Sequence, residues 1–410
     1  MKETALNNMG VLIVSAVFPP EPIVSSKLSF DLYKALNERN IKAIVIHPTP
    51  TRPFGFRPDT QTIGLIGPDE VTTKSYVCPR SSLIGRTRES WSFGRACEKY
   101  IAEHKDEISC IYANAWPMFA QKAIVKKAKK YGIPCIIHVQ DVYPESLTNK
   151  LSGLIGGFVK AFAIPIDKYV LRNCTKVVAI SEKMRDYLIV SRNIPKSKIS
   201  VVINWQDEQD FLEYQKQAVS EELHPFTFMY MGNIGPVAGV DLLIEAFTNT
   251  GLDNARLVIA GSGSMKEKLK ELAEPYKNIE FWDVPNGKVP EIQAKADCML
   301  LPIKKGAASS SIPSKLPAYM FSAKPIIGCM DADSDTATAI NESGGGWVID
   351  PENASKLADT MKSVVGMSED LLKTMGNNAQ KYGLEHFSKK KNLDKLTKVI
   401  MDCIKDLKYE

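Results

Sequence analysis

Short runs of apolar residues alternate with longer amphipathic segments along the whole chain. In the first half, the apolar runs lie at 10–16, 43–47, 108–112, 135–139 and 176–180. The pattern starts again after residue 205, with runs at 226–231, 256–260, 279–282, 298–301, 325–328 and 346–349. Runs this short and this uniformly apolar are typical of parallel strands that crossover helices cover on both faces. We therefore predict an α/β protein with two doubly wound, Rossmann-like parallel sheets.

Two domains also suit the chain length of 410 residues, because a single hydrophobic core rarely grows beyond about 250–300 residues. A polar, acidic crossing at 204–210 separates the two sheet patterns. We predict an N-terminal domain at 1–205 and a C-terminal domain at 206–387. The last segment, 388–410, is predicted to be an amphipathic helix that needs an apolar partner surface. Its apolar positions are Leu393, Leu396, Val399, Ile400, Cys403 and Leu407.

The composition is that of a globular protein, with 44% hydrophobic and 24% charged residues. The net charge of +5 is spread over the chain, and no helix-turn-helix, zinc-finger or aromatic-and-basic pattern supports nucleic-acid binding. The eight cysteines form no close pair, which indicates buried thiols in a reducing compartment. The N-terminus lacks the charged-then-apolar layout of a secretory signal. We therefore expect a cytoplasmic protein, whose oligomeric state the sequence leaves open.

The longest apolar stretch, 153–170, is too interrupted to cross a bilayer, which takes about 20 apolar residues. Five of its apolar residues approximate one helical face: Leu154, Ile155, Phe158, Phe162 and Ile166. That face can pack into the core or rest in a membrane interface. A lysine-rich stretch leaves a similar choice between a solvated face and attraction to anionic lipid. It contains Lys126, Lys127, Lys129 and Lys130.

Ionisable residues lie at, or just after, the end of the strand predicted at 135–139. Ligands of open α/β sheets bind at the carboxyl ends of the strands, and two adjacent doubly wound domains would form a cleft there. His138 and Asp141 lie at this strand end, and Glu145 follows them. A histidine in this place can be a structural hydrogen-bonding group, but its occurrence with Asp141 favours a functional role.

Three loops of the C-terminal half suit a diphosphate. Two are glycine turns between a strand and a helix, where backbone N–H groups can approach a phosphate closely. They contain Gly232, Asn233 and Gly235 in the first turn and Gly261 and Gly263 in the second. The third loop adds hydroxyl groups and a cation. Its candidate residues are Ser309, Ser310, Ser311, Pro313, Ser314, Lys315 and Leu316. Because all three loops belong to one predicted sheet, we expect them to converge on one anion.

The pair Asp331 and Asp333 forms an Asp-x-Asp, which holds a metal in a different enzyme architecture. Here it lies among the strands and helices of the second doubly wound pattern, so we interpret it as a surface loop. No cluster of His or Cys in the sequence supports a metal elsewhere. We therefore expect neither a metal nor another cofactor.

Together these segments resemble family 4 of the retaining glycosyltransferases over nearly the whole chain. In the C-terminal half the resemblance rests on YMGNIG at 230–235, AGSG at 260–263, ADCMLLP at 296–302 and PSKLPAYM at 313–320. HVQDVYPES at 138–146 and ISEKM at 180–184 are similar to the subgroup that builds bacterial capsule and O-antigen units. Within that subgroup the chain looks most like transferases of N-acetylated amino sugars, including N-acetylfucosamine.

The resemblance implies the GT-B fold, a nucleotide-sugar donor in the C-terminal domain, retention of anomeric configuration and no metal. It also implies that the last helix returns to the first domain. Asp141 and His138 would lie near the reacting sugar, and the diphosphate would lie near Gly232, Asn233, Ser314 and Lys315. We place Ser25, Ser26 and Glu145 on the acceptor side. The expected donor is UDP-linked, and the expected acceptor is a lipid-linked saccharide, with peripheral contact to the inner membrane as a further possibility.

The chain departs from this family where charge is expected. Two expected cations are missing, at Asn233 and near Ala238. Two expected acidic residues are replaced by Ser310 and Ala318.

We interpret the chain as a subgroup variant in which Lys315 carries most of the diphosphate stabilisation, with Lys304 or Lys305 assisting. Two alternatives stay open. One is a non-hydrolysing nucleotide-sugar epimerase on the same fold. The other is a catalytically silent nucleotide-binding subunit of a glycan assembly complex.

Overall fold

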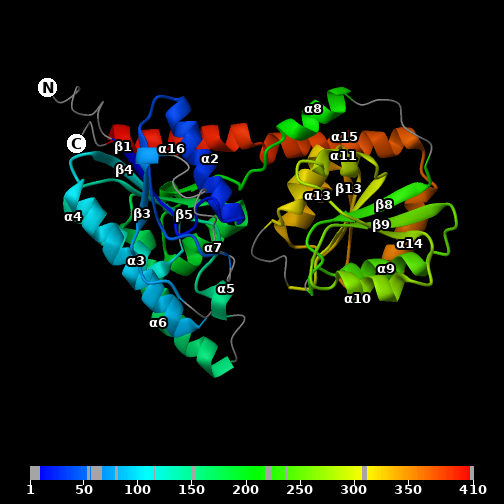
Figure 1. Ribbon diagram of the computed structural model, residues 1–410, viewed down its shortest axis with the longest axis horizontal. Coiled ribbons are helices and arrows are strands. Elements are labelled where there is room, and N and C mark those ends of the chain that lie inside the picture. Colours follow the sequence, from blue (N-terminus) through cyan, green and yellow to red (C-terminus); the bar gives the residue numbers. More distant parts are fainter. Residues whose placement is uncertain are drawn as a thin grey trace. The chain divides into compact units, whose positions relative to one another are not determined.

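The computed structural model of the protein (Figure 1) falls into two compact units, which lie within Met1–Asn204 with Asn392–Glu410 and within Trp205–Lys391. We call them unit 1 and unit 2. The structure describes residues 10–52, 56, 67–78, 82–114, 116–148, 153–217, 224–236, 238–306 and 312–406.

Unit 1 is built on a seven-stranded parallel sheet with the strand order β3-β2-β1-β4-β5-β6-β7. Its strands are β1 (Gly10–Val14), β2 (Ala43–Pro48), β3 (Glu70–Thr73), β4 (Ile108–Asn114), β5 (Cys135–Val139), β6 (Lys176–Ala179) and β7 (Ile199–Val201). The five strands predicted from the apolar runs are confirmed. The two that were not predicted, β3 and β7, are the edge strands of the sheet. The strand order reverses between β1 and β4, which is where ligands of such sheets bind.

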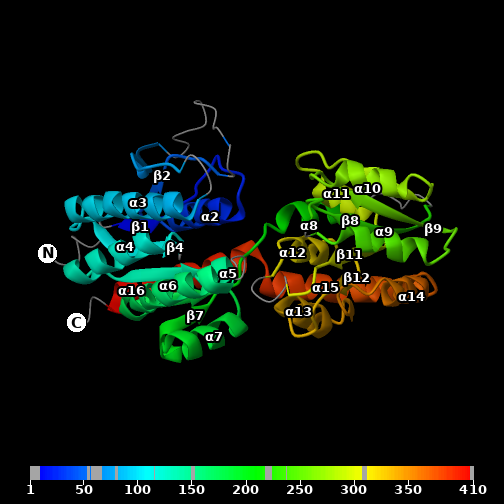
Figure 2. The same ribbon diagram turned by 90° about the horizontal axis from the view of Figure 1, so that it is seen from below.

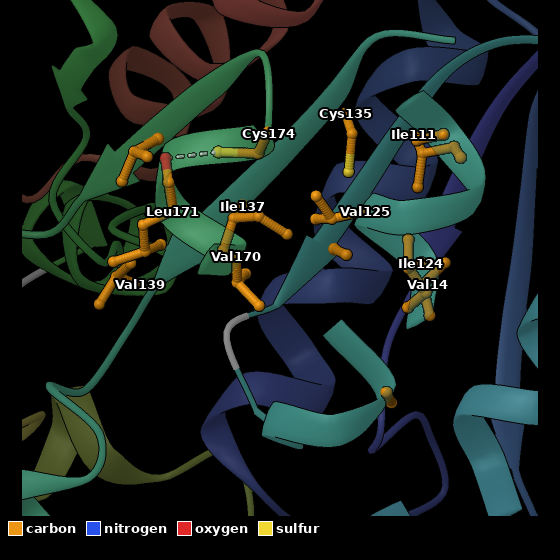
Figure 3. Close-up of a cluster of buried hydrophobic side chains, with 14 of the residues drawn as sticks. Val14, Ile111, Ile124, Val125, Cys135, Ile137, Val139, Val170, Leu171 and Cys174 are labelled. Atoms are coloured by element: carbon orange, nitrogen blue, oxygen red, sulfur yellow. Dashed lines mark hydrogen bonds between the residues drawn. The ribbon is translucent and has the colours of Figure 1, made fainter. Parts of the chain in front are cut away.

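The helices of unit 1 cover its sheet. They are α2 (Val24–Glu38), α3 (Leu83–Glu103), α4 (Met118–Tyr131), α5 (Glu145–Thr148), α6 (Gly153–Asn173) and α7 (Glu182–Arg192), with 3-10 turns at Gly67–Asp69 and Lys196–Lys198. Figure 3 shows part of the core, where Val14 and Ile137 of the sheet meet Val125 of α4 and Val170 of α6. Each such fully buried side chain contributes roughly 1.5–3 kcal/mol to folding. The eight cysteines are all buried free thiols, as predicted.

Unit 2 is built on a six-stranded parallel sheet with the order β10-β9-β8-β11-β12-β13. Its strands are β8 (Phe226–Met231), β9 (Ala255–Ala260), β10 (Ile279–Trp282), β11 (Cys298–Pro302), β12 (Ile326–Cys329) and β13 (Gly346–Ile349), so all six predicted strands are confirmed. Its helices are α8 (Gln209–Gln217), α9 (Val240–Thr248), α10 (Lys266–Ala273), α11 (Val289–Ala294), α12 (Lys315–Phe321), α13 (Asp335–Ser343), α14 (Ala354–Val365) and α15 (Glu369–His386). The predicted fold class, with two doubly wound sheets, is therefore confirmed.

The predicted C-terminal amphipathic helix is α16 (Lys389–Asp406). Its residues from Asn392 onward belong to unit 1. Leu396 and Ile400 are fully buried, and Asp394 forms an ion pair with Arg39, which directly follows α2.

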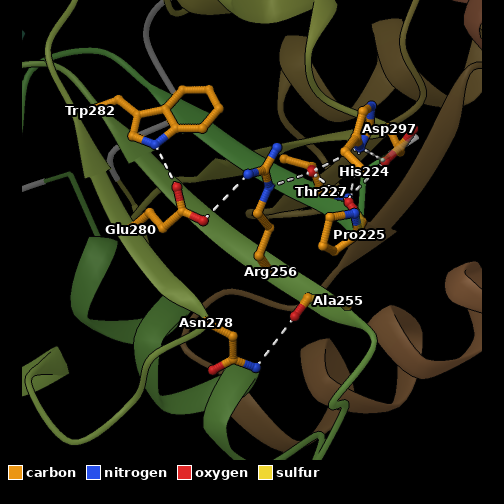
Figure 4. Close-up of polar contacts among 9 residues, drawn as sticks. All are labelled: His224, Pro225, Thr227, Ala255, Arg256, Asn278, Glu280, Trp282 and Asp297. Carbon is orange, nitrogen blue, oxygen red and sulfur yellow. Dashed lines mark hydrogen bonds and ion pairs between the residues drawn. The ribbon is translucent and has the colours of Figure 1, made fainter. Parts of the chain in front are cut away.

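Polar contacts join the amino ends of three strands of unit 2 (Figure 4). Arg256 of β9 donates to Thr227 Oγ1 of β8 at 2.8 Å and pairs with Glu280 Oε1 of β10 at 3.3 Å. The second carboxylate oxygen of Glu280 accepts from Trp282 Nε1 at 2.7 Å. These charged groups satisfy one another, so they act structurally and leave the carboxyl ends of the strands for chemistry.

Candidate functional site

The two predicted glycine turns come together at the carboxyl ends of β8 and β9 in unit 2. The N–H of Gly232 donates to Ala260 O at 2.9 Å, and the N–H of Ile234 donates to Ser262 O at 2.8 Å. A Cβ atom on Gly261 would lie 2.2 Å from Gly232 O, and one on Gly263 would lie 2.2 Å from Ile234 O. With φ values of 132° and 157°, these two glycines also have a backbone conformation that side chains disfavour. The turns therefore interlock with no room for side chains between them.

Lys315, the first residue of α12, lies directly against the first turn. Its Cε is 2.1 Å from where a Cβ of Gly232 would stand, and its Nζ is 5.3 Å from the centre of the Tyr230 ring. Burial lowers the pKa of Lys315. Among the described residues, no carboxylate pairs with it, whereas Lys266 at the second turn is already held by Asp283 Oδ1 at 2.7 Å. A desolvated, unpaired ammonium beside backbone N–H groups is suited to bind an anion.

A buried tyrosine fixes α12 to the end of β8. Tyr319 Oη donates to Met231 O at 2.9 Å and accepts from Met231 N at 2.8 Å. Tyr230 Oη in turn donates to Asn233 O at 2.7 Å, which shapes the first turn. Sequence reasoning did not single out Tyr319, although it lies four residues after Lys315, one helical turn along α12. It positions Lys315 against the glycine turns.

The other predicted donor residues are placed differently. Asn233 and Ser314 are exposed, Gly235 and Pro313 are half-buried, and the Leu316 side chain is fully buried. Ser309, Ser310 and Ser311 lie outside the described residues.

The Asp-x-Asp segment follows β12. Asp331 accepts from Gly306 N at 2.7 Å. Asp331, Asp333 and Lys305 line a hollow together with Asp350. Within the described ranges, no group of three or more His, Cys, Asp or Glu residues is placed to hold a metal ion.

In unit 1, His138 is fully buried on β5 rather than displayed at its end. Its Nδ1 is 2.5 Å from Tyr112 Oη, and its Nε2 has no partner among the described residues. Burial lowers the pKa of His138 to about 3. The imidazole is therefore neutral at physiological pH, and its Nε2 edge can form one more hydrogen bond.

This burial predicts an acid-dependent loss of stability. The folded-state pKa of His138 lies below the unfolded value of about 6.5. The stability that comes from burying the neutral imidazole is therefore fully present above pH 6.5 and is lost as the pH falls. Between pH 8 and pH 5 the parent should lose about 2 kcal/mol more unfolding free energy than His138→Gln. Urea unfolding at both pH values measures this difference. His104→Gln, which changes a half-buried histidine at the end of α3, should behave like the parent; equal losses in all three proteins would contradict the prediction.

The segment after β5 is held by a buried arginine. Arg192, at the end of α7, is 1% exposed and pairs with Glu145 Oε2 at 2.7 Å and Asp167 Oδ2 at 2.5 Å. It also donates to Tyr143 O at 3.3 Å. Burial alone would raise the pKa of Glu145, but hydrogen bonds from Arg192 and Tyr187 lower this pKa overall. Glu145 is thus occupied in structure, while Asp141 in the same segment is exposed.

Unsatisfied polar groups gather where the strand order of unit 1 reverses. Asn114, the last residue of β4, donates to Ser15 Oγ at 3.1 Å and Ser29 Oγ at 3.3 Å, but its Oδ1 lacks a partner among the described residues. Ser25 Oγ donates to Gln140 Oε1 at 2.7 Å. Two further buried oxygens have no partner in the described part of the chain: Ser26 Oγ and Gln121 Oε1. Because buried polar groups are normally hydrogen-bonded, this cluster is suited to a hydroxyl-rich ligand or water.

Comparison with known proteins places both halves of the chain. Residues 26–209 match the family described as Glycosyltransferase Family 4, and residues 213–382 match Glycosyl transferases group 1. WbjE of Pseudomonas aeruginosa, whose name describes a glycosyltransferase, is 20% identical over 291 residues, 68% of this chain and 70% of WbjE. WcaI of Escherichia coli K12, whose name refers to colanic acid biosynthesis, is 26% identical over 201 residues, 46% of this chain and 49% of WcaI.

The fold is similar to that of solved glycosyltransferase structures. HepE of Anabaena in complex with UDP superposes with a TM-score of 0.68 at 14% identity, covering 96% of this chain and 100% of HepE. WaaG, described as involved in lipopolysaccharide biosynthesis, gives a TM-score of 0.64 at 16% identity, covering 95% of this chain and 99% of WaaG.

Proposed function

The chain is a family 4 glycosyltransferase with the GT-B fold, and from this premise we propose that it moves an N-acetylated amino sugar from a UDP-linked donor to a lipid-linked saccharide. The transfer retains anomeric configuration and serves the assembly of capsule or O-antigen polysaccharide. The name of WcaI refers to colanic acid biosynthesis, and the HepE structure is a complex with UDP.

The observation that carries the proposal is the unpaired Lys315 against interlocked glycine turns. When the bond between the anomeric carbon and the diphosphate breaks, the electron pair leaves with the diphosphate oxygen. A cation and N–H groups that are already in place stabilise this charge without reorganising, which is usually the largest single contribution to such catalysis. In this proposal the close packing of Gly232, Gly261 and Gly263 holds the turns in place beside the diphosphate, and Lys315 neutralises the diphosphate.

Unit 1 is proposed to bind the acceptor. The buried polar cluster around Asn114, Ser26 and Gln121 has oxygens without partners among the described residues, and a sugar hydroxyl group that reached them would satisfy them. The free Nε2 of His138 can bond a further hydroxyl, and Asp141 is proposed to face the sugar or acceptor. Glu145 contributes indirectly, because its carboxylate is held by Arg192.

A donor panel assayed with lipid-linked acceptor tests the proposal. UDP-linked N-acetylated amino sugars should give glycosylated lipid only when acceptor is present. Interconversion of donors without acceptor would instead indicate an epimerase. Calorimetric binding of a UDP, GDP or ADP sugar without turnover of that donor in either assay would indicate a silent nucleotide-binding subunit.

Asp141 provides a more specific test. We expect Asp141→Asn to lower kcat roughly 100-fold or more, since a positioned carboxylate typically contributes about 10²–10⁴-fold to catalysis. Its thermal unfolding midpoint should be unchanged, because the side chain is exposed. Asp106→Asn, at an exposed position before β4, is the matched control and should keep full activity. A fully active Asp141→Asn would remove Asp141 from the site.

A further inference from the structure

One surface of unit 1 exposes large apolar side chains. Ile84 and Trp91 of α3 are 84% and 55% exposed, and Phe158 and Phe162 of α6 are 79% and 65% exposed. Ile166, on the same predicted helical face as the two phenylalanines, is buried. The beginning of α6 therefore turns its aromatic residues to solvent, whereas its later part packs into unit 1.

The exposed residues lie on neighbouring helices. Helix α4 packs against both α3 and α6, and Figures 1 and 2 show the three helices on one side of unit 1. Phe119 of α4 connects the two apolar pairs: its N–H donates to Ser90 Oγ, next to Trp91, at 3.0 Å, and its ring centre is 6.3 Å from that of Phe162. We call the area of Ile84, Trp91, Phe158 and Phe162 the α3–α6 surface.

Basic side chains lie around the α3–α6 surface. Helix α4 contains five lysines and no acidic residue, and Lys122 and Lys126 are exposed on it. Lys122 Nζ of α4 lies 5.9 Å from the ring centre of Tyr169 on α6, so its charge lies between α4 and α6. Lys160 is exposed between the two phenylalanines. The Arg95 guanidinium lies 4.8 Å from the Trp91 ring centre.

We propose that the α3–α6 surface docks onto a bilayer that contains anionic phospholipid. Aromatic residues and an aliphatic residue would enter the headgroup region, while the surrounding lysines and arginines pair with lipid phosphates. A protein partner fits less well, because the cores of protein interfaces are depleted in lysine. Among the described residues, no helix is long and apolar enough to cross a membrane, so the contact is peripheral. The inference deepens the proposed function, since a lipid-linked acceptor lies at such a surface, but its evidence is independent of the donor site.

Vesicle binding by the full chain tests the inference. Flotation with phosphatidylcholine vesicles, with and without phosphatidylglycerol, uses neither donor nor acceptor, so its outcome is independent of the proposed reaction. We expect the parent to bind only the anionic vesicles and to be released as salt is raised. The double variant Phe158→Ser/Phe162→Ser should bind them at least 10-fold more weakly, and so should Lys122→Glu/Lys126→Glu.

The matched control changes exposed leucines of unit 2, Leu272→Ser/Leu371→Ser, and should bind like the parent. Thermal unfolding verifies that each variant is folded. The inference is overturned if the parent ignores anionic vesicles, or if the folded phenylalanine variant binds them as the parent does. The inference would also be overturned if a variant of the α3–α6 surface lost binding to a protein partner but bound vesicles as the parent does.

Discussion

Replacing Lys315 with methionine should lower kcat/KM for the nucleotide-sugar donor about 100- to 1,000-fold, the loss typical for one preorganised charge-stabilising group. The ligand-free protein should be as stable as the parent or more stable. A half-buried ammonium without a carboxylate partner among the described residues costs desolvation energy, which methionine avoids at similar length. The substitution should thus lower kcat/KM for the donor without lowering the stability of the ligand-free protein.

The measurement combines donor kinetics, UDP calorimetry and thermal unfolding with and without UDP. In the parent, UDP should raise the unfolding midpoint, and in Lys315→Met this shift should largely disappear. Lys268→Met, at an exposed position on α10, is the matched control and should retain both the shift and the activity. Unchanged kcat/KM and UDP affinity in Lys315→Met would assign the diphosphate to other groups.

Strands inside the two sheets were predictable because burial on both faces selects uninterrupted apolar runs. The edge strands of unit 1 lack such uninterrupted apolar runs. The sequence of β3 is Glu-Val-Thr-Thr, and β7 has only three residues, Ile199–Val201. Neither has an apolar run long enough to be recognised, whereas β10 and β13, the edge strands of unit 2, are more apolar and were predicted.

The glycine turns of the site were predictable for a local reason. Close backbone approach needs glycine, and glycine is visible in a sequence. The contacts that position the site are not local. Tyr319 reaches the backbone of Met231, and Arg192 reaches carboxylates at Glu145 and Asp167. Residues so distant in sequence show no spacing that would connect them. For the same reason the full burial of His138 against Tyr112 could not be read from its position at a strand end.

Substitution of Arg192 by methionine should cost about 3–5 kcal/mol of unfolding free energy, because it leaves two largely buried carboxylates without their cation. Burial already raises the pKa of Asp167 to about 6, against the lowering effect of Arg192. Without the arginine, the Asp167 carboxyl group should stay protonated to a higher pH in the folded protein than in the unfolded chain. A raised carboxyl pKa makes stability fall as pH rises, so the loss should be larger at pH 8 than at pH 5.

Urea unfolding of Arg192→Met at the two pH values tests both the size and the sign of the effect. Neutralising the carboxylates in Arg192→Met/Glu145→Gln/Asp167→Asn should restore much of the stability and remove the extra loss at pH 8, since no uncompensated charge remains buried at these positions. Arg185→Met, on the same helix but paired with exposed acids, should cost less than about 1 kcal/mol. If Arg192→Met costs no more than Arg185→Met, the arginine does not hold the segment after β5. If instead the triple variant is stable but inactive, the arginine and its carboxylates position Asp141 for catalysis as well as stabilising the fold.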